Sequence, residues 1–266
     1  MGLLDGRVAI VTAGGGIGMG SAIAKKFAGE GAAVVLADID GERAATVAGE
    51  IKATGGRALA VRTDVTDAAA VQAMVDAAVA EFGKISILIN HAGENTAATS
   101  VETMTEEGWD RVLAVSLKGM YHCTRAAVPH MKKENWGRIV STASKGGFRP
   151  SNGNKVVSAY GAAKQAMVGF SRALAVELGP WNITLNCIAP GFVESSGMID
   201  PATGKPQVLT AEQQAMFTKN AGQVATPLRY ATVQEAAEAF FYFVGPAGTR
   251  VTGTTLHLNG GSYFGT

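Results

Sequence analysis

The segment from Val8 to Gly20 reads VAIVTAGGGIGMG, and it predicts a buried strand, a tight glycine turn and the start of a helix. Residues 8–11 are apolar without alternation, which is typical of a strand covered on both faces. Glycines let the turn bring its backbone close to a pyrophosphate, which the N-terminus of the next helix attracts. A glycine motif alone is a weak signal, but here it stands in the strand, turn and helix order that a dinucleotide site requires.

Short apolar runs and amphipathic stretches alternate along the rest of the chain. We expect further strands at 33–37, 58–61, 85–89, 138–142, 183–188 and 254–258, and helices at 18–29, 41–53, 67–82, 105–131, 158–178 and 232–244. Apolar strands that alternate with helices indicate an α/β protein with a mostly parallel sheet covered on both faces. Right-handed crossovers then give a doubly wound, or Rossmann, fold of seven strands.

The longest irregular stretch, at 191–227, follows the carboxyl end of the strand expected at 183–188. A loop of this length within a compact domain is either functional or disordered, and we interpret it as a lid over a ligand crevice. No linker divides the chain, so we expect a single domain over residues 1–266.

An acidic residue, Asp38, lies eighteen positions beyond Gly20, at the end of the second expected strand. A carboxylate at this place accepts hydrogen bonds from the adenosine ribose hydroxyls of NAD and repels the 2′-phosphate of NADP. The glycine turn contains no Arg or Lys and Ile39 follows Asp38, so we favour NAD. The alternative role for Asp38 is a helix N-cap, which Asp40 fills better.

A tyrosine and a lysine four residues apart, Tyr160 and Lys164, lie in the Ala-rich helix expected at 158–178. Residues four apart share a helix face, so the phenol and the ammonium should point into the same space. A nearby positive charge lowers the pKa of a tyrosine and lets it exchange a proton with an alcohol or ketone oxygen. Ser144, after the strand expected at 138–142, could hold that oxygen. Alone, such a Tyr–Lys pair is more often a solvated surface pair.

Composition and charge argue against several classes of protein. The chain has 266 residues, of which 47% are hydrophobic and 17% charged, so it can bury a sizeable core. The net charge is +1 and no Lys/Arg run is longer than two, which argues against a nucleic-acid or basic membrane partner. The first apolar run follows Asp5 and is broken by glycines, so we expect neither a signal peptide nor a membrane span.

The cysteines and histidines carry no strong signal of their own. Cys123 and Cys187 lie in apolar segments, so we expect buried thiols in a reducing compartment, the cytoplasm. The four histidines are scattered without metal-ligand spacing, and we expect no metal site.

Taken together, these motifs resemble the short-chain dehydrogenase/reductase (SDR) family over the whole chain. The resemblance is carried by Gly14-x3-Gly18-x-Gly20, Asp64-Val65, Asn90-His91-Ala92-Gly93, Ser144, Tyr160-x3-Lys164, Asn186, Pro190-Gly191 and the stretch 253–261. Because these are independent motifs in the right order, a chance match is very improbable.

The resemblance implies a role for each matching residue. Tyr160 would be the general acid/base, Ser144 would polarise the substrate oxygen, and Lys164 would bind the nicotinamide ribose and lower the pKa of Tyr160. The implied NAD-binding residues are Gly14, Gly18, Met19, Asp38, Ile39, Asp64, Val65, Asn90, Ala92, Gly93, Tyr160, Lys164, Pro190, Gly191, Val193 and Ser195. The substrate should contact Ser144, Gly146, Asn152, Tyr160 and Phe192, with Glu94, Asn95, Phe148 and Met198 completing the pocket wall.

The chain departs from the family pattern at several positions. Ala13 separates Thr12 from the first glycine, so the turn should carry one extra residue, and His91 stands where a second Asn is common. Ser116 stands where the family commonly has an Asn that distorts the long helix and holds a water in a proton relay to the lysine. A serine can bond back to a helical carbonyl or to a water, so we count Ser116 as catalytic and expect the relay to persist.

Two hypotheses of different classes remain. The leading one is an oxidoreductase that passes a hydride between NAD(H) and a secondary alcohol or ketone. The alternative is a cofactor-binding regulatory or scaffold protein that keeps the fold without turnover, against which the intact Ser144, Tyr160 and Lys164 argue. The helices that begin at 105 and 158 carry more apolar and small residues than one sheet face needs. The family commonly pairs these helices between subunits, so we expect a homotetramer.

Overall fold

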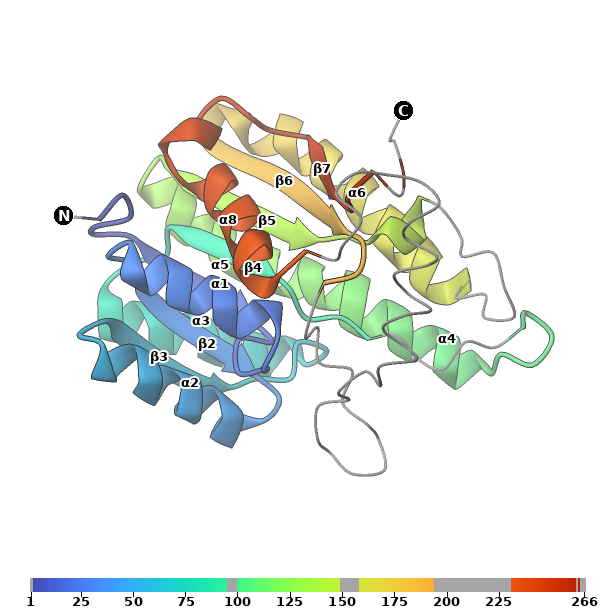
Figure 1. Ribbon diagram of the computed structural model, residues 1–266, viewed down its shortest axis with the longest axis horizontal. Helices are drawn as coiled ribbons and strands as arrows, with labels where there is room; N and C mark the ends of the chain where they lie inside the picture. The colour runs from blue at the N-terminus through green and yellow to red at the C-terminus, as the bar shows by residue number, and fades with distance from the viewer. Residues whose placement is uncertain (1, 95–99, 149–157, 194–230, 262, 264–266) are drawn as a thin grey trace.

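The computed structural model describes residues 2–94, 100–148, 158–193, 231–261 and 263. Its strands form one seven-stranded sheet in the order β3-β2-β1-β4-β5-β6-β7, and every neighbouring pair is parallel. Helices cover both faces of the sheet (Figure 1). The doubly wound fold expected from the sequence is confirmed.

The elements follow the expected alternation closely. The strands are β1 Val8–Thr12, β2 Ala33–Asp38, β3 Arg57–Arg62, β4 Ile87–Asn90, β5 Gly137–Thr142, β6 Ile183–Pro190 and β7 Thr255–Leu258. The α-helices are α1 Met19–Gly29, α2 Gly41–Ala53, α3 Ala68–Phe82, α4 Glu106–Leu113, α5 Gly119–Lys133, α6 Ser158–Leu178 and α8 Val233–Val244.

The core lies in two layers, one on each face of the sheet. One layer joins α1, α2 and α8 to the sheet, and α1 and α8 lie side by side in Figure 1. The other layer joins α3, α5 and the end of α6 to the opposite face. Along β1, Val11 faces the first layer and Ile10 the second, which is why the strand is apolar at consecutive positions.

Side-chain caps begin several helices at the expected places. Asp40 accepts hydrogen bonds from the N–H groups of Glu42 and Arg43 and caps α2, so Asp38 is left for another role. Thr232 and Glu235 form the capping box at the start of α8. None of the described helices is long and apolar enough to cross a bilayer.

The long helix expected at 105–131 is present and runs without a break through α4 and α5, but it is not α-helical throughout. A π-helical turn at Ala114–Lys118 separates α4 from α5, and the buried Ser116 lies at its centre. A π turn accommodates one extra residue in the helical ladder and often marks a functional site. Since residues of ordinary helix character form this turn, periodicity alone predicts one uninterrupted helix.

The order in which strands are added to the sheet reverses at β1. The chain steps outward from β1 to β2 and β3, and then returns to place β4 on the other side of β1. In open α/β sheets, ligands bind at the carboxyl ends of the strands that flank such a switch point. The topology therefore places a candidate site where β1 and β4 end.

Candidate active site

The turn between β1 and α1 is held tightly against its neighbours. Ala13 has a φ of 53°, in the left-handed region that residues other than glycine rarely adopt. A Cβ at Gly20 would overlap the carbonyl oxygen of Ala13, and a Cβ at Gly15 would lie 2.5 Å from the backbone nitrogen of Ala44. The turn can therefore approach both α1 and α2 only because these two positions carry no side chain.

A cavity of about 180 Å³ opens beside this turn, and we call it the switch-point cavity. Its lining residues are Ala13, Asp38, Ile39, Thr63, Asp64, Val65, Ala92, Gly93, Glu94, Arg111 and Val115. Six of the residues that the sequence suggested for cofactor binding thus meet in one space. Sequence reasoning missed Arg111 and Val115, which lie four residues apart and so share a face across the junction of α4 and the π turn.

The two aspartates of the switch-point cavity are both held by backbone N–H groups. One carboxylate oxygen of Asp38 accepts from Gly15 at 3.0 Å, and the other accepts from Asp40 at 3.0 Å. Oδ1 of Asp64 accepts from the backbone N–H of Thr66 at 2.9 Å and from its hydroxyl at 2.7 Å. These bonds hold the pKa of Asp64 below its usual value, and the charge of Arg111 acts in the same direction.

One hydroxyl fixes the loop that follows β4. Thr12 Oγ1 donates to the carbonyl of Ile89 at 3.2 Å and accepts from the N–H groups of His91 at 2.9 Å and Ala92 at 3.0 Å. A hydroxyl has one donor and two acceptor positions, so all of its capacity is used. The ends of β1 and β4 are therefore tied together beside the switch-point cavity.

Asn90 is placed differently from the other residues suggested for cofactor binding. Its side chain is buried, and its amide nitrogen donates to Thr124 Oγ1 at 3.3 Å and to Ser141 Oγ at 3.4 Å. It does not line the switch-point cavity. The side chain joins β4 to α5 and β5, and a direct contact of Asn90 with the cofactor stays a prediction.

The three residues of the expected catalytic group converge where β5 ends beside α6. Ser144 shares a hydrogen bond with the Tyr160 side chain, and Ser144 Oγ also accepts the N–H of Gly146 at 3.1 Å. Lys164 is buried and donates to the carbonyl of Thr142 at 2.6 Å. Its Nζ lies 5.5 Å from the centre of the Tyr160 ring, so the four-residue spacing brings both side chains to one place.

Burial dominates the pKa values of the tyrosine and the lysine in this group. Burial around the hydroxyl raises the pKa of Tyr160 above its ordinary value, and the hydrogen bond with Ser144 opposes this only in part. Burial also lowers the pKa of Lys164 to about 8. Burial therefore sets the direction of the Tyr160 shift, and a lowering of this pKa by Lys164 stays a prediction.

His91 adds a third titratable group to this cluster. Its Nδ1 lies 2.9 Å from Oγ1 of Thr142, the residue whose carbonyl binds Lys164. Burial, together with the charge of Lys164, lowers the pKa of His91 to about 4. His91 is therefore neutral at physiological pH, and it leaves Lys164 as the cation of the cluster.

Ser116 faces the same space from the π turn. Its Oγ accepts the backbone N–H of Glu94 at 3.3 Å. A Cβ built on Gly93 would lie 3.1 Å from Lys164 Nζ and 3.6 Å from Ser116 Oγ, so both groups converge on this glycine. The sequence-predicted association of Ser116 with Lys164 is thus compatible with the geometry, and the relay itself stays a prediction.

The end of β6 and the segment after it carry further residues that the sequence suggested for cofactor and substrate binding. The N–H of Gly191 donates to the carbonyl of Leu258 at 2.8 Å, and Val193 pairs with Ala231 in an isolated parallel bridge. Phe192 is half exposed, and Nζ of Lys145 lies 4.9 Å from its ring centre. Lys145 directly follows Ser144, and sequence reasoning did not single it out.

Several predicted site residues lie outside the described residues, namely Asn95, Asn152, Ser195, Met198 and most of the expected lid at 191–227. Glu94, which we expected in the substrate pocket, instead lines the switch-point cavity and pairs with Arg111. Among the described residues, no group of three or more His, Cys, Asp or Glu side chains could hold a metal ion.

Comparisons of the sequence and of the structure with known proteins both find dehydrogenases and reductases. Residues 7–205 match the family model described as short chain dehydrogenase. The chain is 39% identical to the short-chain reductase protein NovJ of Streptomyces niveus, over 96% of this chain and 93% of that protein. It is 36% identical to the (2S)-[(R)-hydroxy(phenyl)methyl]succinyl-CoA dehydrogenase subunit BbsD of Thauera aromatica, over 97% of each.

A solved structure shares the fold over nearly the whole chain. It is the 3-ketoacyl-(acyl-carrier-protein) reductase of Brucella melitensis in complex with NADH, with a TM-score of 0.82 and 33% identity. The match covers 97% of this chain and 98% of that one.

Proposed function

Because the chain belongs to the short-chain dehydrogenase family, it is an oxidoreductase that transfers a hydride to or from a nicotinamide cofactor, and we propose that this cofactor is NAD(H) and the substrate a secondary alcohol or ketone. The observation that carries the proposal is the convergence of Ser144, Tyr160 and Lys164 beside the switch-point cavity. When bound, the nicotinamide supplies the hydride donor or acceptor.

The residues of the switch-point cavity fit the adenosine half of such a cofactor. Asp38 is held by two backbone N–H groups at the end of β2, where its carboxylate can accept bonds from ribose hydroxyls. The lining contains three carboxylates, Asp38, Asp64 and Glu94, against one cation, Arg111. This excess of negative charge disfavours an added 2′-phosphate, which supports NAD over NADP.

Tyr160 is proposed to exchange a proton with the substrate oxygen, and Ser144 to hold that oxygen. A phenol whose pKa is raised by burial keeps its proton at neutral pH and can donate it to a ketone oxygen. Alcohol oxidation requires the reverse transfer, which becomes easier when positive charge approaches the phenol. Lys164 lies one helical turn away and supplies a positive charge in its protonated form.

A binding and turnover assay tests this proposal. NADH and NADPH would be titrated against the protein, and a panel of 3-hydroxyacyl thioesters, aryl alcohols and polyols would be screened with both oxidised cofactors. The names of BbsD and the Brucella reductase, which both describe acyl substrates, support starting with the thioesters. We expect turnover in the wild type, and a loss of activity with retained NADH binding in Tyr160→Phe, because the phenol acts on the substrate oxygen.

Near-normal activity of Tyr160→Phe would contradict the proposed role of the phenol. The scaffold hypothesis predicts tight NADH binding without turnover across the whole panel. It is not favoured, because the relatives described above are named as reductases and dehydrogenases.

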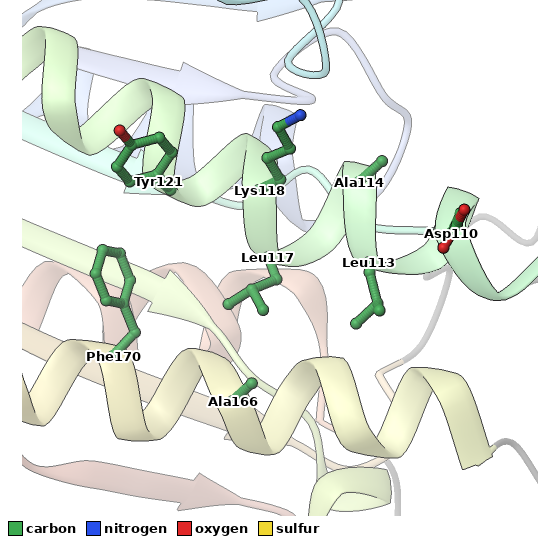
Figure 2. Close-up of a pocket in the computed structure, with 8 residues that line it drawn as sticks. All are labelled: Asp110, Leu113, Ala114, Leu117, Lys118, Tyr121, Ala166 and Phe170. Atoms are coloured by element: carbon green, nitrogen blue, oxygen red, sulfur yellow. The ribbon is translucent and has the colours of Figure 1, made fainter.

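We further propose that the protein forms a homotetramer, one of whose interfaces is made by α4, α5 and α6. A groove of about 650 Å³ lies between these helices, and Leu113 and Leu117 point across it towards Ala166 and Phe170 (Figure 2). Tyr121 is half exposed above Phe170. A second copy would cover this apolar surface, and light scattering that gives the mass of a monomer would contradict the proposal.

A cytoplasmic location is proposed as well. Cys123 and Cys187 are both buried and form no disulfide, which suits a reducing compartment. Burial raises the pKa of Cys123 to about 12, so this thiol resists oxidation.

A further inference from the structure

An ion pair crosses the wall of the switch-point cavity. Arg111 Nε lies 2.6 Å from Glu94 Oε2, and both side chains line the cavity. Glu94 belongs to the loop after β4 and Arg111 to α4, so the pair joins two separate elements. The side chains are 47% and 34% exposed, and ion pairs so exposed contribute little to folding stability. The position of the pair beside the cavity therefore suggests a role in binding.

Arg111 combines a flat cation with an apolar neighbour on the same helix face. Val115 lies four residues further on and lines the same cavity, as do Ile39 and Val65. A guanidinium is planar and stacks on aromatic rings, whereas a lysine ammonium is a compact point charge. A flat cation among aliphatic side chains provides the surroundings that a heteroaromatic base prefers.

The guanidinium is also held in place before any ligand arrives. Glu94 binds it directly, and the charge of Arg111 reaches Asp64, whose carboxylate is fixed by Thr66. An arginine already paired with a carboxylate loses less rotamer freedom when a ligand packs against it. Glu94 is anchored in turn, since its backbone N–H donates to Ser116 Oγ at 3.3 Å.

We propose that Arg111 packs against the face of the adenine ring of the cofactor and that Glu94 is the residue that positions it. The inference rests on the proposed function, because it assumes that the switch-point cavity receives the adenosine half of NAD. It adds two residues from outside the family motifs to the binding site. It also gives Glu94 a place at the adenine end, away from the substrate.

Calorimetric titration of three probes tests the proposal: NADH, AMP, and reduced nicotinamide mononucleotide, which lacks the adenosine. Arg111→Met should weaken the binding of AMP and NADH about tenfold, as expected for loss of a cation–π contact, and leave the mononucleotide unchanged. Arg111→Lys should recover only part of this loss, because it restores the charge without the planar group. Glu94→Gln should weaken AMP binding by about two- to fivefold, since it removes only the orienting ion pair.

Arg125→Met, which removes an exposed arginine of α5 that does not line the cavity, is the matched control and should bind all three probes like the wild type. Unchanged AMP and NADH affinity in Arg111→Met would overturn the proposal. An equal loss for the mononucleotide would also overturn it, because the change would then be a general structural effect. If the wild type bound none of the three probes, the proposed function itself would fail.

Discussion

Replacing His91 by asparagine should remove a loss of stability that the wild type suffers in mild acid. Burial and the charge of Lys164 lower the pKa of His91 from 6.5 to about 4 in the folded protein. In the unfolded chain the ring regains its ordinary pKa, so between these two values the unfolded state binds more protons than the native state. The stability associated with this group is therefore complete above the unfolded pKa and falls as the pH drops towards the folded one.

The size of the effect follows from the two pKa values. One unit of difference in pKa corresponds to about 1.4 kcal/mol, so the wild type should lose about 2 kcal/mol between about pH 7.5 and about pH 5 through His91. Asparagine does not titrate, and its amide can still bond to Thr142 Oγ1, which lies 2.9 Å from the imidazole Nδ1. The pH-dependent loss in His91→Asn should be smaller than that of the wild type by this amount.

Urea unfolding followed by circular dichroism measures the difference. Both proteins would be unfolded at the two pH values and at one protein concentration, because subunit association would otherwise shift the apparent stability. NADH titration at the higher pH would check that the variant keeps its site. Equal losses in the two proteins would refute the reasoning, since they would mean that His91 takes up its proton as readily when folded as when unfolded.

Three further substitutions test the cofactor site and the catalytic cluster. Asp38→Ser should weaken NADH binding about 10- to 100-fold, because it removes a charged acceptor of hydrogen bonds, and should weaken NADPH less; a calorimetric preference for NADH as strong as that of the wild type would contradict the assignment. Ser116→Asn should raise kcat, because it restores the residue that holds the relay water in the family. An unchanged kcat with the same pH profile would show that the serine already supports the proton relay. Gly93→Ala should lower kcat/KM about two- to fivefold, since its Cβ would lie 3.1 Å from Lys164 Nζ and push the ammonium slightly aside; wild-type kinetics would mean that the lysine can move without consequence.

Sequence patterns were sufficient where local rules decide the structure. The spacing and composition of residues 158–178 predicted α6 with its observed bounds, and Asp40 was identified as the N-cap of α2 because short polar residues prefer that position. The motifs also assigned Asp38, Asp64 and Gly93 to one cofactor site, and these residues line one cavity although they come from three different strands or their loops.

The features that sequence reasoning missed depend on tertiary structure. Helix periodicity did not predict the π turn around Ser116, and only the family resemblance marked this position as one where the long helix is distorted. Arg111 and Glu94 are seventeen positions apart, and nothing in either segment indicates that they meet. The direction of the Tyr160 pKa shift also required the structure, because spacing predicts which charge is near but not how much solvent is excluded.

The saturated hydroxyl of Thr12 constrains how this chain can vary in length during evolution or engineering. Ala13, with its left-handed backbone, comes one residue later, so a residue gained or lost in the glycine turn would leave the bonds of Thr12 in place but would disturb the turn's own contacts with Asp38 and Ala44. A residue gained or lost within β1 would reverse the direction of every side chain in the strand. It would also carry the anchoring oxygen away from His91 and Ala92, leaving two amides without their acceptor. Length changes within β1 should therefore be the least tolerated, because they disturb the strand pattern and the Thr12 anchor together.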